Sequence, residues 1–164
     1  MKKLFSFITI LVCLVLTMQA QTGSKLSVVL TQYYAVKNSL VAGDAVKAGA
    51  NATEFVKAVN AVDTKALVAA EQKVFQSLQA KLLADGGVIG ASKDIAKQRE
   101  IFASLSTNMI SLAKVAKISD AAIYVDYCPM KKSSWLSEDK AIKNPYYGNS
   151  MLTCGSVKET FSNK

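Results

Sequence analysis

The sequence contains no histidine, and its 164 residues include a single arginine, Arg99, beside nineteen lysines. The absence of histidine excludes serine–histidine hydrolases, histidine acid–base catalysis and imidazole metal sites.

Proteins that read nucleic acids rely on clustered arginines to bind bases and phosphates. Here the lysines are interspersed with acids at helical spacing, as Lys57 is with Glu54. This pattern is typical of solvated helix faces, and we expect no nucleic-acid partner.

Proline and glycine are also scarce, with two and eight residues respectively. Such a composition excludes collagenous and low-complexity chains, and the apolar fraction of 51% excludes intrinsic disorder. The length supports one domain with at most a small appended subdomain.

The acids near the C-terminus, Asp126, Glu138 and Asp139, are scattered and form no paired-carboxylate site. We therefore expect a protein that is not an enzyme.

Residues 1–20 are predicted to be a cleaved export signal. Two lysines precede an apolar run, and the segment ends in the small residue Ala20. The run is too short for a membrane span, and no later segment could form one. A lipid anchor on Cys13 is not favoured, because Val12 before it is not small. We expect a periplasmic or secreted chain without a membrane span, whose charge falls from +8 to +6 when two lysines leave with the signal.

Residues 21–120 are predicted to form an antiparallel four-helix bundle, so the fold class is expected to be all-α. Residues 41–120 hold seventeen alanines, three aromatic residues and no proline, which is a helical composition. The first helix is expected to end near Gly43, and Asp44 can cap the second. Asp63 or Thr64 can cap the third.

The end of the third helix is predicted at the run Asp85-Gly86-Gly87. A fourth helix is expected over residues 92–117. Its core face is indicated by apolar residues at heptad-like spacing, namely Ile95, Phe102, Leu105, Met109 and Leu112.

Residues 121–164 differ in composition and are predicted to form a small irregular cysteine/methionine subdomain packed on the bundle. They contain both prolines, the single tryptophan and both cysteines that remain after signal cleavage, Cys128 and Cys154. Residues 123–127 are β-branched and aromatic, which favours a short strand. The pairs Asn144-Pro145 and Gly148-Asn149 favour turns beyond it.

Four sequence blocks in this tail resemble one family of exported bacterial proteins, the domain of unknown function 3347. The blocks are Tyr127-Cys128-Pro129-Met130, Trp135-Leu136-Ser137, Asn144-Pro145-Tyr146-Tyr147-Gly148 and Met151-Leu152-Thr153-Cys154-Gly155. A related segment is fused to the periplasmic adaptor subunits of some heavy-metal efflux pumps. The resemblance implies an envelope protein whose partner is a metal-efflux component. The gap from Met130 to Trp135 is shorter than in many members.

The same residues indicate a soft-metal site, independently of the resemblance. Cys128 and Met130 form a C-x-M pair, and Met151 and Cys154 form an M-x-x-C pair. Residues two apart in an extended segment, or three apart in a turn, project to one side. Two thiolates and two thioethers together favour Cu(I) over hard cations. We therefore predict a non-catalytic protein that binds or delivers Cu(I) in metal homeostasis or efflux.

The alternative is a disulfide between Cys128 and Cys154, since a pair of cysteines in an oxidising compartment is first a disulfide candidate. Closing a loop of about 27 residues would stabilise the tail by about 3 kcal/mol. Met130 and Met151 would then fill a small core, and the protein would be a stapled structural or interaction module. The two states can also alternate with redox conditions. A thiol oxidoreductase is a weaker hypothesis, because the sequence lacks a C-x-x-C motif.

Overall fold

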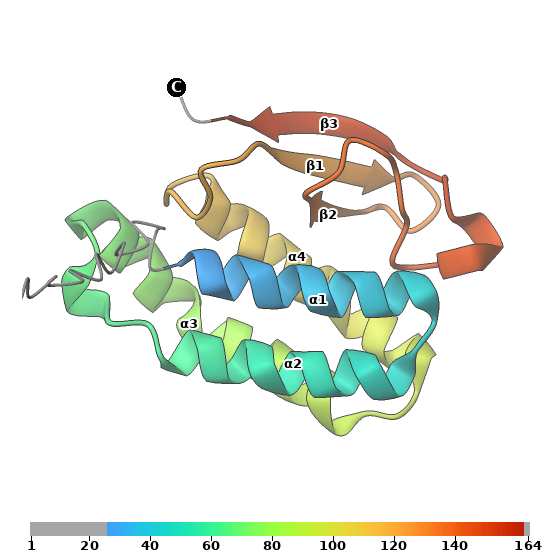
Figure 1. Ribbon diagram of the computed structural model, residues 1–164, viewed down its shortest axis with the longest axis horizontal. Coiled ribbons are helices and arrows are strands. Elements are labelled where there is room, and N and C mark those ends of the chain that lie inside the picture. Colours follow the sequence, from blue (N-terminus) through green and yellow to red (C-terminus); the bar gives the residue numbers. More distant parts are fainter. Residues whose placement is uncertain (1–25, 163–164) are drawn as a thin grey trace, which may run out of the picture.

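The computed structural model describes residues 26–162, and in this range four α-helices are followed by three β-strands (Figure 1). The predicted export signal, residues 1–20, and Cys13 lie outside the described residues. Between residues 26 and 162, no helix has the length and apolar character needed to span a membrane. The elements are α1 (Ser27–Ala42), α2 (Ala45–Asn60), α3 (Ala69–Ala91), α4 (Ile95–Ala113), β1 (Ile123–Cys128), β2 (Ser133–Ser137) and β3 (Ser156–Phe161), with 3-10 helices η1 (Thr64–Ala66) and η2 (Gly148–Met151).

The junction between α1 and α2 confirms the sequence-based boundaries. Gly43 adopts a left-handed conformation with φ of 75° and ends α1, as glycine does most easily. The side chain of Asp44 then accepts a hydrogen bond of 2.8 Å from the N–H of Lys47 and caps α2. The two helices therefore reverse direction over a very short connection.

The predicted end of α3 is wrong, because the helix continues through Gly86 and Gly87 to Ala91. Gly86 faces α2, and a Cβ atom at that position would lie 2.9 Å from Val56 Cγ2 and 3.0 Å from Phe55 Cδ1. The glycine therefore allows close helix packing rather than a turn. The N-terminal prediction also shifts, since Asp63 caps η1 and α3 begins only at Ala69.

The fourth helix is confirmed but is shorter than the expected 92–117: it spans Ile95–Ala113, with Asp94 as its N-cap. Most of the predicted core face is fully buried, namely Phe102, Leu105, Met109 and Leu112.

The all-α prediction is wrong, because the tail forms a three-stranded antiparallel sheet of order β2-β1-β3 rather than an irregular subdomain. Only the first strand was expected from the sequence. Cys128 pairs with Ser133, so a loop of residues 129–132 joins β1 to β2, with Lys132 at φ of 55°. β3 pairs on the other side of β1, with Tyr127 opposite Ser156. A sheet satisfies the backbone hydrogen bonds that an irregular tail would leave open beside the core.

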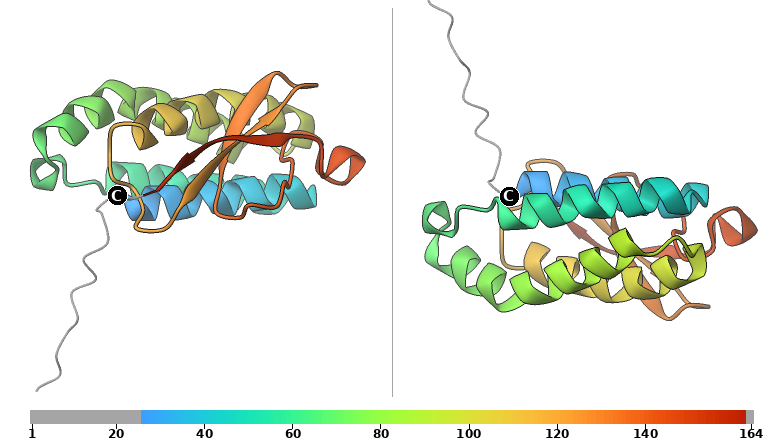
Figure 2. Two further views of the ribbon diagram at one scale, coloured as in Figure 1. Left: turned by 90° about the horizontal axis from the view of Figure 1, so that it is seen from above. Right: turned by 90° about the horizontal axis from the view of Figure 1, so that it is seen from below.

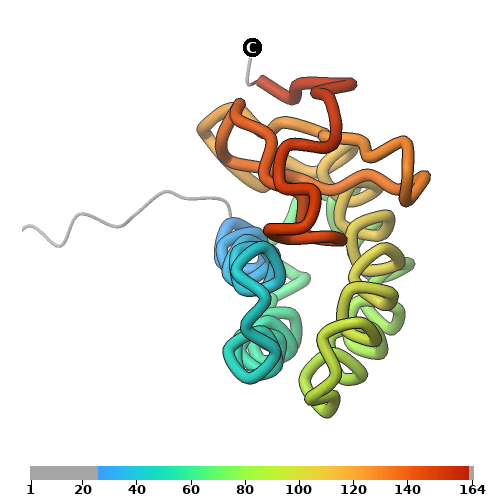
Figure 3. Tube along the Cα trace, turned by 90° about the vertical axis from the view of Figure 1, so that its right-hand side faces the viewer, coloured from blue at the N-terminus to red at the C-terminus, as the bar shows by residue number. Residues whose placement is uncertain are grey.

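The sheet lies across α1 and α4, while α2 and α3 form the opposite side of the molecule (Figures 2 and 3). The buried Tyr33 of α1 joins the layers. Its hydroxyl group hydrogen-bonds with Ser106 Oγ of α4 at 2.7 Å and accepts the N–H of Leu136 of β2 at 3.1 Å. Its ring stacks on Phe102, with 5.2 Å between centroids. Bundle and sheet therefore share one hydrophobic core.

The two neighbouring glycines of α3 allow a matched test of this packing. A Cβ atom added at Gly87 would have no heavy atom within 4 Å, so Gly87→Ala should raise the free energy of unfolding by up to about 1 kcal/mol through helix propensity. In Gly86→Ala the new methyl group would clash with Val56, and this should cancel the gain in helix propensity. Gly86→Val should lower the free energy of unfolding by about 1–3 kcal/mol. Urea unfolding of the three variants measures the difference. Equal gains from alanine at both positions would show that α2 and α3 are not packed this closely.

Candidate functional site

The structure brings the two cysteines of the predicted site into contact. Cys128 ends β1, and Cys154 lies two residues before β3, the strand paired with β1. Their Sγ atoms are 3.6 Å apart, and both thiols are free. Cys128 is fully buried, whereas Cys154 is only partly buried. Residues that are 26 positions apart in sequence thus form one thiol pair with an inner and an outer sulfur.

The loop after β1 surrounds the inner sulfur with hydrogen-bond donors. The N–H of Lys131 donates to Cys128 Sγ at 3.5 Å. Burial by itself raises the pKa of the Cys128 thiol, but hydrogen bonds from the backbone of Lys131 and Met130 and from the side chains of Asn144 and Cys154 lower it below its ordinary value. The site therefore stabilises a thiolate on Cys128 with hydrogen-bond donors rather than with cations.

The outer thiol is perturbed in the opposite direction. The hydrogen bond with Cys128 raises the pKa of Cys154, and burial and the charge of Cys128 add to the rise. A thiol that donates to a neighbouring thiolate holds its proton more tightly. When the pair loses a proton, the charge is therefore favoured on Cys128 over Cys154.

Asn144 fixes the second cysteine relative to the first. It is fully buried, and its Nδ2 donates to the carbonyl of Cys154 at 2.7 Å. Its Oδ1 accepts the N–H of Tyr146 at 2.8 Å. Its backbone N–H donates to the carbonyl of Leu152, and its own carbonyl accepts from Gly148. The loop from Asn144 to Cys154 is thus organised around one amide side chain.

The two predicted thioether ligands lie in the turns that carry the cysteines. Met130 follows Cys128 in the β1–β2 loop, and the carbonyl of Met151 accepts the N–H of Cys154 at 3.1 Å. Their residues are 62% and 41% exposed, so neither fills the core. The part of the chain that the structure describes has no group of three or more cysteine, aspartate or glutamate side chains placed to hold a metal ion. Any ligands of a metal ion beyond the two thiols would therefore come from the thioethers or from outside the described residues.

The aromatic residues beside the site belong to the core. Trp135 is fully buried and meets Tyr146 edge-on, with ring centroids 5.7 Å apart. The hydroxyl group of Tyr146 donates to the carbonyl of Ser134 at 2.7 Å. Gly155 has φ of 149°, and a Cβ there would lie 3.0 Å from Trp135 Cη2. The ring of Trp135 therefore packs closely against the backbone of Gly155, the residue after Cys154.

The burial of Asp126, two residues before Cys128, was not predicted from the sequence. Asp126 is 0% exposed, and neither of its carboxylate oxygens has a hydrogen-bond partner. Burial raises the pKa of this carboxyl group to about 6, against the lowering effect of Lys37. Lys37, also buried, pairs with Glu138 at 2.7 Å. The available signal was a single acid inside an otherwise apolar and aromatic strand.

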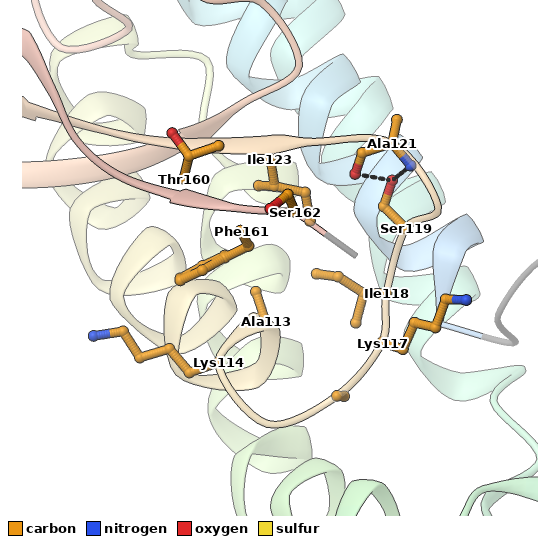
Figure 4. A pocket seen from close by; sticks show the side chains of 11 residues that line it. Ala113, Lys114, Lys117, Ile118, Ser119, Ala121, Ile123, Thr160, Phe161 and Ser162 are labelled. Carbon is orange, nitrogen blue, oxygen red and sulfur yellow. Dashed lines mark hydrogen bonds between the residues drawn. The ribbon is translucent and has the colours of Figure 1, made fainter. Parts of the chain in front are cut away.

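A separate pocket of about 460 Å³ lies where the C-terminal end of α4 meets the ends of β1 and β3 (Figure 4). Ile118 and Phe161 form part of its apolar wall. Lys114 and Lys117 also line it, but each has an acidic partner, Glu159 at 3.6 Å and Asp120 at 2.8 Å. The pocket is at the opposite end of β1 from Cys128, and its lining includes no sulfur ligand.

Asn144 allows a test of how the site is held. Asn144→Ala should lower the free energy of unfolding by about 2–4 kcal/mol, because the buried N–H of Tyr146 and carbonyl of Cys154 lose their partners. Asn149→Ala, an exposed change in the same loop, should alter it by less than about 0.5 kcal/mol. Chemical unfolding followed by tryptophan fluorescence measures both. Similar values for the two variants would contradict the central role of Asn144.

Asp126 gives a pH-dependent prediction. Its folded-state pKa of about 6 lies above the ordinary value of 3.8, so its contribution to stability falls as pH rises from about 4 to 6. Asp126→Asn should therefore raise the free energy of unfolding at pH 7 by about 3 kcal/mol and have little effect near pH 4. Urea unfolding of both proteins at the two pH values measures this. A gain that is the same at both pH values would contradict it.

The comparisons with known proteins identify a family but no characterised relative. The family described as "Protein of unknown function (DUF3347)" matches residues 29–121. No curated protein and no solved structure matches the chain. The matched residues span the helices and end before β1, so the four tail blocks lie outside them. Because the match covers more than half of the sequence, the chain belongs to the DUF3347 family.

Proposed function

We propose that the protein binds one Cu(I) ion at Cys128 and Cys154, with Met130 and Met151 as thioether ligands, and carries it in the cell envelope without catalytic turnover. The observation that supports this most is the contact of 3.6 Å between the two Sγ atoms. Two thiolates bound at about 2.3 Å to a tetrahedral ion lie about 3.8 Å apart. The thiol pair thus needs little movement to hold a metal ion.

The surroundings of the thiol pair support a soft ion. Hydrogen bonds from the backbone of Met130 and Lys131 favour the thiolate form of Cys128, and a thiolate is the form that binds metal. Asp126 is the acid nearest to Cys128 in the sequence, and the charge of Lys37 in α1 acts on its carboxyl group. With no histidine in the chain, thiolate and thioether are the available ligands, and this set favours Cu(I).

The exposure of the methionines supports transfer rather than permanent storage. Met130 and Met151 are on the surface, beside the partly buried Cys154, whereas Cys128 is covered. An ion can therefore arrive at weak outer ligands and exchange inward by stepwise ligand replacement. The expected partner is an envelope metal-efflux component, which the resemblance of the tail implies, and the expected location is the periplasm or the exterior.

The second candidate is a disulfide-stapled interaction module, and the same sulfur contact favours it. However, the segments around both cysteines are already held by the β1–β3 ladder and by Asn144. The fold in this region therefore does not depend on a covalent bond. Whether the bond is closed in the cell stays a prediction.

Anaerobic titration of the reduced protein with Cu(I), in competition with a colorimetric Cu(I) chelator, tests the metal site. We expect one tightly held ion per chain, loss of binding in Cys128→Ser, and affinity lowered about 10–100-fold in Met130→Leu/Met151→Leu. Leucine keeps the shape of methionine and removes only the sulfur ligand, so the melting temperature of the apo protein should not change. An unaltered affinity of the double variant would remove the thioethers from the site. Failure of the reduced wild type to compete would overturn the proposal.

A further inference from the structure

We propose that Cys128 and Cys154 form a redox gate: exchange with a disulfide-bearing compound closes a bond between them and switches off metal binding. This inference rests on the proposed function, because it assigns a regulation to the same site. The two sulfurs are in direct contact at 3.6 Å. Closing a disulfide of about 2.05 Å requires them to approach by about 1.5 Å, which small side-chain rotations can supply.

The unequal burial of the sulfurs sets the order of the reaction. Cys154 is partly exposed, whereas Cys128 is fully buried behind it. Cys154 gives up its proton, and its thiolate attacks one sulfur of an incoming disulfide RSSR; this forms a mixed disulfide, and the departing sulfur takes up a proton and leaves as RSH. Cys128 then attacks Sγ of Cys154, forms the internal bond and releases the second RSH. The protein loses two electrons and two protons, and RSSR gains them.

The hydrogen bonds around Cys128 make this bond easy to reduce. The N–H of Lys131 donates to Cys128 Sγ at 3.5 Å, and the two Sγ atoms share a further hydrogen bond at 3.6 Å, in the structure with free thiols. A disulfide sulfur is a weaker acceptor than a thiolate, so these donors favour the dithiol over the closed form. Stabilisation of the reduced form is what makes a disulfide labile rather than structural.

Closure changes the ligand set but not the fold. The disulfide removes both thiolates and leaves only the thioethers of Met130 and Met151 for a metal ion. The sheet and the hydrogen bonds of Asn144 hold both segments in either state. The oxidised protein should therefore be folded and unable to retain Cu(I), and reduction should restore binding.

A matched pair of single-cysteine variants tests the order. On incubation with oxidised glutathione, Cys128→Ser should accumulate a mixed disulfide on Cys154 at least about 10-fold faster than Cys154→Ser accumulates one on the buried Cys128, as measured by intact mass. Equal rates in two variants that both stay folded by circular dichroism would overturn the assigned order.

The gate itself is tested by equilibrating the wild-type protein in mixtures of reduced and oxidised glutathione, alkylating free thiols and weighing the products. We expect both states to be populated as the ratio is varied, with Cu(I) affinity at least about 100-fold lower in the oxidised form. A bond that persists in excess reduced glutathione would be a structural staple and would overturn the gate. Equal Cu(I) binding by both forms would also overturn it, while leaving the proposed metal function intact. If the reduced form fails to bind Cu(I), the proposed function fails even where the exchange is observed.

Discussion

The buried hydroxyl group of Tyr33 fixes how the helices and the sheet meet. It joins α1 to α4 through Ser106 and both helices to β2 through the N–H of Leu136. A polar group in this position is costly to bury unless it is paired, so the three elements must meet in one arrangement. The stacked ring of Phe102 and the edge contact from Trp135 to Tyr146 extend that junction into the sheet. The sulfur site lies at the end of β1, which pairs with the strand held by this junction, β2.

Because the site is built at the ends of paired strands, its geometry follows from the sheet rather than from a flexible tail. The β1–β2 loop turns within residues 129–132 and directs its N–H groups at Cys128. Asn144 holds the other cysteine from the opposite side. Functional groups that are supported in this way are pre-organised, and little ordering energy is lost when a ligand binds.

Local signals in the sequence predicted the helices and most of their ends, but they did not predict the sheet. Gly43 and Asp44 act through their nearest neighbours, so the end of α1 and the cap of α2 were predictable. Gly86 was misread as a stop because its role depends on Phe55 and Val56, which lie far earlier in the chain. β3 pairs with β1 from far along the chain, with Tyr127 opposite Ser156, and no single-residue propensity reveals that. β2 pairs locally across residues 129–132, but the sequence analysis did not identify this hairpin. The cysteine pair was predictable from its spacing and composition, whereas the role of Asn144 and the burial of Asp126 required the folded chain.

Two of the donors that tune Cys128 belong to the main chain. Peptide N–H groups carry no net charge, do not titrate and are the same for every residue type except proline. The identities of residues 130 and 131 are therefore free to drift during evolution without altering this part of the sulfur environment. Substitutions at Met130 and at the lysines after it can therefore change the side chains around Cys128 without changing the peptide N–H groups that act on its sulfur. A sulfur environment that is set by peptide groups is in this way independent of the side chains in the loop that supplies them.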